Sequence, residues 1–176
     1  MKSKMSKIKM ILMDVDGVLT DGSIILGSNN IEIKAFNVQD GLGITLARLA
    51  GLKTGIITGR KSDVVEHRAK ELKFDVLSQG SFNKYPEYLL IKKQYNLNSE
   101  EICYIGDDLL DIAILREVGF SAAPANARDE VKAVCDYVTV AKGGYGAVRE
   151  VVDKILIRQD KFDGLIRDLI TIDYPF

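Results

Sequence analysis

The sequence predicts an α/β fold: a Rossmann-like, doubly wound parallel sheet with helices on both faces and a β-hairpin inserted after the first strand. Three observations favour this fold. Short apolar runs alternate with helix-like stretches of about ten residues, as in βαβ crossovers. Glycine or polar residues end these apolar runs abruptly. With 176 residues, 47% of them apolar, the chain can bury one sizeable core.

The first apolar run lies in KMILMDVDGVLTD, residues 9–21. Because it is short and bounded by acids and glycine, it is typical of a buried strand rather than a helix. Asp14 and Asp16 are separated by one residue, so on an extended chain they share a face, and Gly17 then permits a tight turn. Two such carboxylates repel each other unless a cation, a shared proton or an electrophile joins them.

The remaining elements follow in order. Residues 23–36 contain two β-rich runs around a loop of about four residues, which indicates the hairpin. Asp40 is expected to cap one helix, Ser62 to open the next, and Pro86 to be the first residue of a third. The expected helices cover residues 40–49, 62–73, 86–95, 109–118 and 128–134, and the further strands 54–58, 75–77, 102–105, 120–122 and 137–140.

Composition excludes several classes of protein. The 24 basic and 25 acidic residues nearly balance, so no field attracts nucleic acid or a membrane surface. Only four apolar residues follow the N-terminal lysines, too few for a signal peptide or a membrane span, and we expect a cytoplasmic protein. Cys103 and Cys135 lack metal-site spacing and are expected to be reduced thiols. His67 is the single histidine, expected at a helix surface, which argues against zinc sites and histidine-based triads.

Polar side chains follow four of the predicted strands. They are Asp14 and Asp16, then Thr58, then Gln79 with Lys84, and finally Asp107, Asp108 and Asp111. In a doubly wound sheet these strand ends gather along one edge. The carboxylates then form an oxygen-rich site suited to Mg²⁺. Thr58 and Lys84 suit a phosphoryl group, which a free aspartate can attack in line.

The motifs DVDGVLTD, ITGR, QGSFNK and IGDDLLD resemble, in order, spacing and residue type, the four motifs of the haloacid dehalogenase superfamily of phosphohydrolases. The likeness covers residues 9–158, where KAFNVQDGLGI, ITGRKSDVVEHRAKEL and GGYGAVREV resemble the cap-less sugar-acid phosphatase branch. The two points where the superfamily inserts caps hold only a hairpin and one helix, so we expect no cap domain. We expect residues 1–176 to form a single phosphatase domain with a divergent tail over residues 160–176.

The resemblance implies a mechanism with an aspartyl-phosphate intermediate. Asp14 is the implied nucleophile, Asp16 the general acid and base, and Thr58 and Lys84 bind the transferring oxygens. The implied ligands of Mg²⁺ are Asp14, the backbone carbonyl of Asp16, and Asp107, with Asp108 and Asp111 in outer positions.

The resemblance also implies the substrate, 3-deoxy-D-manno-octulosonate 8-phosphate, in lipopolysaccharide precursor synthesis. Gly59, Arg60 and Arg68 are the implied substrate-binding residues, although by themselves the arginines read as solvated helix charges. An arginine fork at position 60 can hold a substrate carboxylate in a bidentate pair. The alternative is a phosphatase for a nine-carbon sugar-acid 9-phosphate, in which we expect an acidic residue directly after the Thr-Gly pair.

Two further function classes stay open beside the phosphatase. A receiver-type signalling domain needs its phosphorylated aspartate after the third strand, where this chain has Ser78 and Gln79. A non-catalytic oligomerisation module related to sugar-nucleotide enzymes is disfavoured because Asp16 is present. A lone two-stranded hairpin is marginal in water, so pairing of hairpins between subunits is expected, and the resemblance implies a homotetramer.

Overall fold

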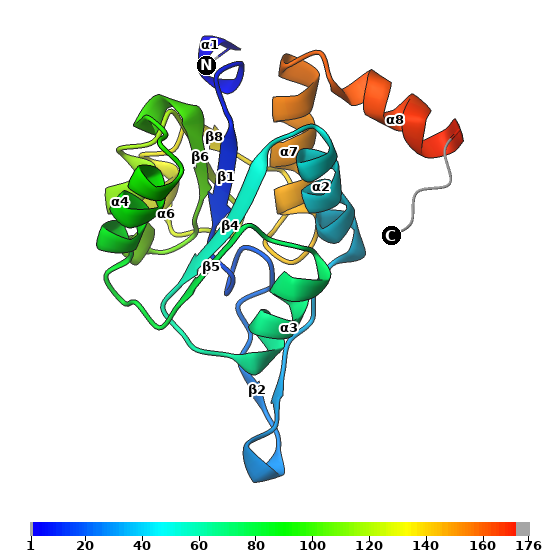
Figure 1. Ribbon diagram of the computed structural model, residues 1–176. Coiled ribbons are helices and arrows are strands. Elements are labelled where there is room, and N and C mark those ends of the chain that lie inside the picture. Colours follow the sequence, from blue (N-terminus) through cyan, green and yellow to red (C-terminus); the bar gives the residue numbers. More distant parts are fainter. Residues whose placement is uncertain (1, 172–176) are drawn as a thin grey trace.

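The computed structural model describes residues 2–171, and a six-stranded, all-parallel sheet lies at its centre (Figure 1). The strands are β1 (Met10–Met13), β4 (Lys53–Thr58), β5 (Val76–Gln79), β6 (Ile102–Ile105), β7 (Phe120–Ala123) and β8 (Tyr137–Val138). They lie in the order β5-β4-β1-β6-β7-β8. After β1 the chain adds β4 and β5 on one side of it, and then crosses back to add β6, β7 and β8 on the other side. This confirms the predicted doubly wound sheet and places the switch point between β1 and β6.

Helices cover both faces of the sheet (Figure 1). One face carries α2 (Val38–Leu49), α3 (Asp63–Glu71) and α7 (Ala147–Arg158), and the other carries α4 (Lys84–Gln94), α5 (Ile112–Leu115) and α6 (Asp129–Lys132). Side chains of β1 alternate between the two cores: Ile11 and Met13 face the first, and Met10 and Leu12 face the second. A strand covered on both sides has no polar face, which explains the continuous apolar run.

The hairpin extends from the carboxyl edge of the sheet (Figure 1). It pairs β2 (Ile25–Leu26) with β3 (Glu32–Ile33) in antiparallel register, around a 3₁₀ turn, η1 (Ser28–Asn30). This confirms the hairpin predicted within residues 23–36. Its apolar side chains are about half exposed, in contrast to the buried apolar residues of the central sheet.

Two expected helix starts were wrong. Asp40 does not cap α2, because Asn37 is the N-cap and accepts a hydrogen bond from the Gln39 amide. Asp40 is instead buried, and it accepts hydrogen bonds from the first-turn amides of Gly146 and Arg149, which tie α7 to α2. Helix α4 begins at Lys84, so Pro86 is its third residue; a proline is tolerated there because first-turn amides lack a helical partner.

The helix expected over residues 109–118 is broken into a 3₁₀ turn, η3 (Leu109–Asp111), and the single-turn α5. Asp108 caps η3 by accepting from the Leu109 amide. The Asp111 side chain turns back to accept from the amides of Asp107 and Asp108. These local bonds compete with a regular helix at its start.

The described chain also contains α1 (Lys2–Met5), η2 (Ser99–Glu101) and a final helix, α8 (Phe162–Thr171), which packs its apolar side against the core under α7. The predicted tail therefore begins as a helix, while residues 172–176 lie outside the described part. None of the helices within residues 2–171 is long and apolar enough to cross a membrane. His67 is exposed and both cysteines are free thiols, as predicted.

Candidate active site

Three aspartates and one lysine meet at the switch point, and we call them the aspartate cluster. Asp14 follows β1, Asp107 follows β6 after a glycine, Asp111 ends η3, and Lys84 begins α4. The Lys84 ammonium donates to Asp14 Oδ2 at 2.6 Å and to Asp111 Oδ1 at 2.7 Å. Four residues from distant segments are thus joined in one buried group, because parallel strands deliver their carboxyl ends to the same edge.

Asp111 is the most enclosed member of the cluster. It is fully buried and accepts from the Tyr104 hydroxyl at 2.7 Å, besides Lys84 and the backbone amides of Asp107 and Asp108. Both of its oxygens are therefore satisfied within the protein. Asp111 orients its neighbours, and this fits an outer position better than a direct metal ligand.

The charges of the aspartate cluster do not balance, since three carboxylates face one ammonium. Burial raises the pKa of Asp14 to about 6, against the opposing effect of Lys84. Burial, together with repulsion from Asp14 and Asp111, raises the pKa of Asp107 to about 8. Asp107 Oδ1 is also buried without a hydrogen-bond partner among the described residues. Each observation indicates that positive charge is lacking at this place, and three carboxylates with one ammonium leave a net charge of −2.

An oxygen-binding divalent cation fits this lack of charge. One carboxylate oxygen from each of Asp14, Asp107 and Asp111 lies within 4.8 Å of the others. Hard carboxylate oxygens at such separations suit Mg²⁺, which takes one or two carboxylates and keeps several waters. Asp14 and Asp107, which is not fully satisfied by the protein, are the residues that would hold it.

The loop after β1 is held against this cluster by close backbone contacts. Gly17 has φ +90°, and a Cβ there would lie 2.0 Å from Asp107 Oδ2. Gly143 covers the same loop, since a Cβ at that position would lie 1.8 Å from the carbonyl oxygen of Gly17. Glycine is required at both positions, and the GGYG stretch before α7 is therefore part of the wall of the site.

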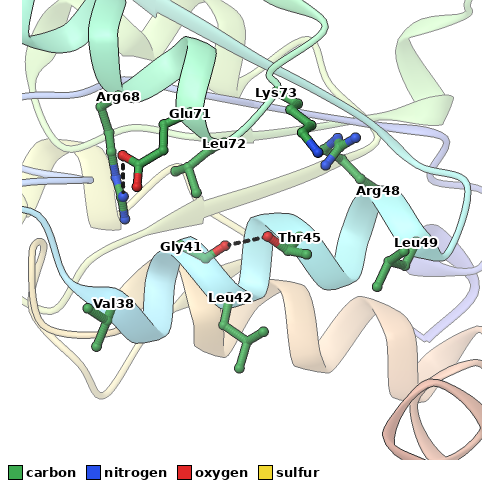
Figure 2. A pocket seen from close by; sticks show the side chains of 10 residues that line it. All are labelled: Val38, Gly41, Leu42, Thr45, Arg48, Leu49, Arg68, Glu71, Leu72 and Lys73. Atoms are coloured by element: carbon green, nitrogen blue, oxygen red, sulfur yellow. Dashed lines mark hydrogen bonds and ion pairs between the residues drawn. The ribbon is translucent and has the colours of Figure 1, made fainter. Parts of the chain in front are cut away.

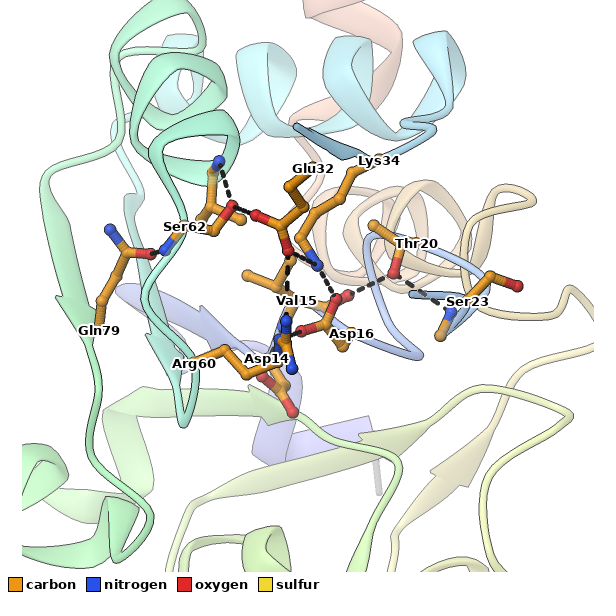
Figure 3. A network of polar contacts seen from close by, with 12 residues as sticks. Asp14, Val15, Asp16, Thr20, Ser23, Glu32, Lys34, Arg60, Ser62 and Gln79 are labelled. Carbon is orange, nitrogen blue, oxygen red and sulfur yellow. Dashed lines mark hydrogen bonds and ion pairs between the residues drawn. The ribbon is translucent and has the colours of Figure 1, made fainter. Parts of the chain in front are cut away.

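A second polar group lies beside the first, and we call it the hairpin network (Figure 3). Its charged members are Asp16, Glu32, Lys34 and Arg60. Lys34 donates to Asp16 Oδ1 and lies 3.5 Å from Glu32 Oε1. Arg60 Nη2 is also 3.5 Å from Glu32 Oε1, and Arg60 Nε is 3.8 Å from Asp16 Oδ2. Two carboxylates here face two cations.

The hairpin network joins the hairpin to the loop after β4. Ser62, the N-cap of α3, donates its hydroxyl to Glu32 Oε2 at 2.5 Å. The Ser62 amide donates to Gln79 Oε1 at 3.0 Å, which fixes the same loop to β5. Glu32 is thus anchored from the sheet side, although it belongs to the protruding hairpin.

The other expected site residues lie around these two groups. Thr58 is the buried last residue of β4, two residues beyond Ile56, the register partner of Met13, and Gly59 follows it. Asp108 is exposed and caps η3, apart from the cluster.

Arg68 lies elsewhere. It belongs to a groove between α2 and α3, where its guanidinium pairs with Glu71 at 2.8 Å (Figure 2) and stacks over Phe36. Within one chain, the structure does not bring Arg68 to the aspartate cluster.

Sequence reasoning missed Lys34 and Glu32. The signal was present as an alternation, since residues 31–34 read Ile-Glu-Ile-Lys. In a strand this places both charges on one face and both isoleucines on the other. The charged face here is the inner one, the reverse of what a solvated hairpin would show.

Comparisons with known proteins agree with this geometry. Residues 74–151 match the family model described as haloacid dehalogenase-like hydrolase. The chain is 43% identical over 161 residues to the 3-deoxy-D-manno-octulosonate 8-phosphate phosphatase of Escherichia coli K12, covering 92% of this chain and 86% of the relative.

Among solved structures, the phosphatase of that name from Moraxella catarrhalis, in complex with magnesium, phosphate and KDO, shares 43% identity with a TM-score of 0.93. That match covers 96% of this chain and 97% of the other. The Yersinia pestis structure of the same name shares 41% identity with a TM-score of 0.91, covering 93% and 88% of the two chains.

Proposed function

This chain belongs to the haloacid dehalogenase-like hydrolases, in the family of 3-deoxy-D-manno-octulosonate 8-phosphate phosphatases, and from that premise we propose that it hydrolyses this sugar-acid phosphate with Mg²⁺. The observation that carries the proposal is the aspartate cluster at the switch point, with a buried Asp107 oxygen that lacks a partner. This reaction would supply lipopolysaccharide precursor synthesis, and we propose that the protein acts in the cytoplasm.

Asp14 attacks phosphorus, and its attack displaces the sugar alkoxide and leaves an aspartyl phosphate. Asp16 gives a proton to the departing alkoxide and then takes one from the water that hydrolyses the intermediate. Lys84, which donates to Asp14 Oδ2, and Thr58, buried at the end of β4, are the proposed donors to the phosphoryl oxygens. Asp14, Asp107 and the Asp16 carbonyl would hold Mg²⁺, which would supply positive charge to neutralise the phosphoryl oxygens.

Substrate recognition is assigned to the loop after β4. Arg60 is partly exposed, follows Gly59, and faces the edge where Asp16 lies; its contacts with Glu32 and Asp16 are long, at 3.5 and 3.8 Å, which leaves guanidinium donors for a substrate carboxylate. Arg68 lies in the groove between α2 and α3, and a role in substrate binding requires the substrate, or a second chain, to extend there.

The test compares kcat/KM for the eight-carbon 8-phosphate and a nine-carbon 9-phosphate, with Mg²⁺ and with excess EDTA. We expect Mg²⁺-dependent release of phosphate and a preference for the eight-carbon ester of about 10-fold or more. Preference for the nine-carbon ester would refute the substrate while the phosphatase stands. If neither ester releases phosphate with Mg²⁺, the phosphatase proposal itself is wrong.

We further propose that the chain assembles as a homotetramer through the hairpin. The isoleucines at 25, 31 and 33 and Leu26 are each about half exposed or more. Such an apolar outer face on strands of two residues is unfavourable in a monomer. Light scattering tests this proposal, and replacement of Ile25 and Ile33 by Thr should yield smaller species. A monomeric wild type at micromolar concentration would contradict it.

A further inference from the structure

Lys34 is the most enclosed cation outside the aspartate cluster in the described chain, with a side chain that is 1% exposed. A buried ammonium is unfavourable unless carboxylates pair with it closely. Its partners are Asp16 and, at 3.5 Å, Glu32. The packing therefore fixes where the ammonium lies, rather than leaving it to move like a surface lysine.

The two oxygens of Asp16 have different surroundings. Lys34 donates to Oδ1, whereas the nearest cation to Oδ2 is Arg60 Nε at 3.8 Å, beyond hydrogen-bond distance. One oxygen is thus held by the protein, and the other is left without a donated hydrogen bond from either cation. A carboxyl group that exchanges a proton with a substrate needs this asymmetry, with one oxygen fixed and the other free to carry the proton.

We propose that Lys34 is a positioning residue that holds Asp16 Oδ1 and thereby presents Oδ2 to the leaving oxygen of the substrate. The inference rests on the acid–base role of Asp16 in the proposed function. Glu32 supports it, because Glu32 contacts Lys34 and is itself anchored by the Ser62 hydroxyl at 2.5 Å. The hairpin therefore supplies a residue to the chemistry in addition to any role in assembly.

The test uses two esters that differ in their need for an acid. A sugar-acid phosphate expels an alkoxide, which requires protonation, whereas p-nitrophenyl phosphate expels a stabilised phenolate. Because kcat/KM reports the first irreversible step, it isolates the transfer to Asp14 from the later hydrolysis. We expect Lys34→Met to lower kcat/KM for the sugar-acid phosphate about 10- to 100-fold, and for the aryl ester less than about threefold.

Three further variants make the test specific. In the Asp16→Asn background, loss of Lys34 should cost no more than about twofold, since Lys34 acts through Asp16. Lys34→Arg should restore most of the activity, because it keeps a donor to Oδ1. The matched control is Lys53→Met, which removes a lysine paired with Asp75 at the opposite end of β4 and should leave both esters unchanged. Thermal unfolding checks the fold, and Lys34→Gln replaces Lys34→Met if that variant is unfolded.

Equal losses on both esters, or a tenfold further loss in the Asp16→Asn background, would overturn the inference. If Asp16→Asn lowers kcat/KM for the sugar-acid phosphate and Lys34→Met does not, the positioning role of Lys34 is wrong while the proposed function stands. Undiminished turnover by Asp16→Asn would overturn the acid–base role of Asp16, and the role of Lys34 with it.

Discussion

The aspartate cluster and the hairpin network lie side by side at one edge of the sheet, yet their charges are arranged differently. The aspartate cluster has three carboxylates against one ammonium, two raised pKa values and a buried oxygen without a partner. In the hairpin network, two carboxylates face two cations in mutual contact. From this difference we infer that a buried group of unbalanced charge indicates where a ligand of opposite charge binds. A group of balanced charge indicates where the protein positions its own side chains.

The largest expected effect concerns the nucleophile. Asp14→Asn removes the carboxylate that we propose attacks phosphorus, and we expect kcat to fall by about 10⁴-fold or more. Asp16→Asn, in the balanced group, should cost about 10²-fold by loss of proton transfer. Steady-state phosphate release measures both, with Asp129→Asn on the exposed surface of α6 as the control. Near-wild-type turnover by Asp14→Asn would contradict the role of Asp14 as nucleophile, and with it the contrast between the aspartate cluster and the hairpin network.

Next in size is a loss of stability in the aspartate cluster. Lys84→Met leaves Asp14 and Asp111 buried without their cation, and the free energy of unfolding without metal should fall by about 3 kcal/mol. With excess Mg²⁺ the loss should shrink, because the ion neutralises the same carboxylates. The control is the exposed ion pair of Lys53 with Asp75, since Lys53→Met should change the free energy of unfolding by less than about 1 kcal/mol. Denaturant unfolding measures these values, and equal losses at the two lysines would contradict the prediction.

A smaller effect is expected in the hairpin network, on specificity. Arg60→Glu would place a third carboxylate near Asp16 and Glu32 and repel the substrate carboxylate. We expect the ratio of kcat/KM between the eight- and nine-carbon esters to fall about 10- to 100-fold, while turnover of p-nitrophenyl phosphate changes less. Arg128→Glu, at an exposed arginine, is the control. An unchanged ratio would show that Arg60 does not set the preference.

The smallest effect is a dependence of stability on pH. Asp14 and Asp107 have folded pKa values of about 6 and about 8, above their value in the unfolded chain. The folded metal-free protein thus binds more protons, so its stability falls as pH rises from about 4 to about 8. Between pH 6 and 8 Asp14 loses its remaining proton and Asp107 stays largely protonated, so we expect stability to fall by about 1 kcal/mol per pH unit, below the limit of about 1.4 kcal/mol per pH unit for one fully protonated group.

Mg²⁺ should abolish this pH dependence and stabilise the protein more at pH 8 than at pH 6, since it displaces the proton from Asp107. Thermal unfolding with and without EDTA at the two pH values measures the effect. Asp107→Asn supplies the control, because a metal-free variant without this carboxylate should keep only the small contribution of Asp14 over the same range. A rise in metal-free stability toward pH 8 would be the wrong sign.

Most of the fold was predictable because strands covered on both faces carry an unambiguous signal. The run before Asp14 and the run before Asp107 are continuous and apolar, and a polar residue follows each of them. The sequence therefore predicts that both aspartates lie at the carboxyl edge of the sheet. Helix starts were less predictable. Asp40 sits in the first turn of α2, yet its carboxylate serves α7, a contact between residues more than one hundred positions apart.

The site was predictable where a residue follows a strand of the central sheet, directly or, like Lys84 and Asp111, within a few residues, and not where it reaches the site from the hairpin or from the loop before α7. Lys34 follows β3 of the hairpin and Gly143 lies in the loop before α7, so neither follows a strand of the central sheet. Arg68 shows the opposite case: the family resemblance implied that it binds substrate together with Arg60, but within one chain its side chain turns toward α2. Local spacing along a helix does not say which neighbour the side chain will meet.

The contact of Gly143 with Gly17 also bears on when the site can exist during synthesis. Residues near position 17 leave the ribosome first, but the stretch that covers their loop lies about 125 residues later, just before α7. Asp40 likewise obtains its partners only when Gly146 and Arg149 have emerged. A nascent chain that ends before Gly143 therefore carries both halves of the aspartate cluster without the wall that holds the β1 loop in place, and the enzyme is assembled only when this stretch and α7 have docked.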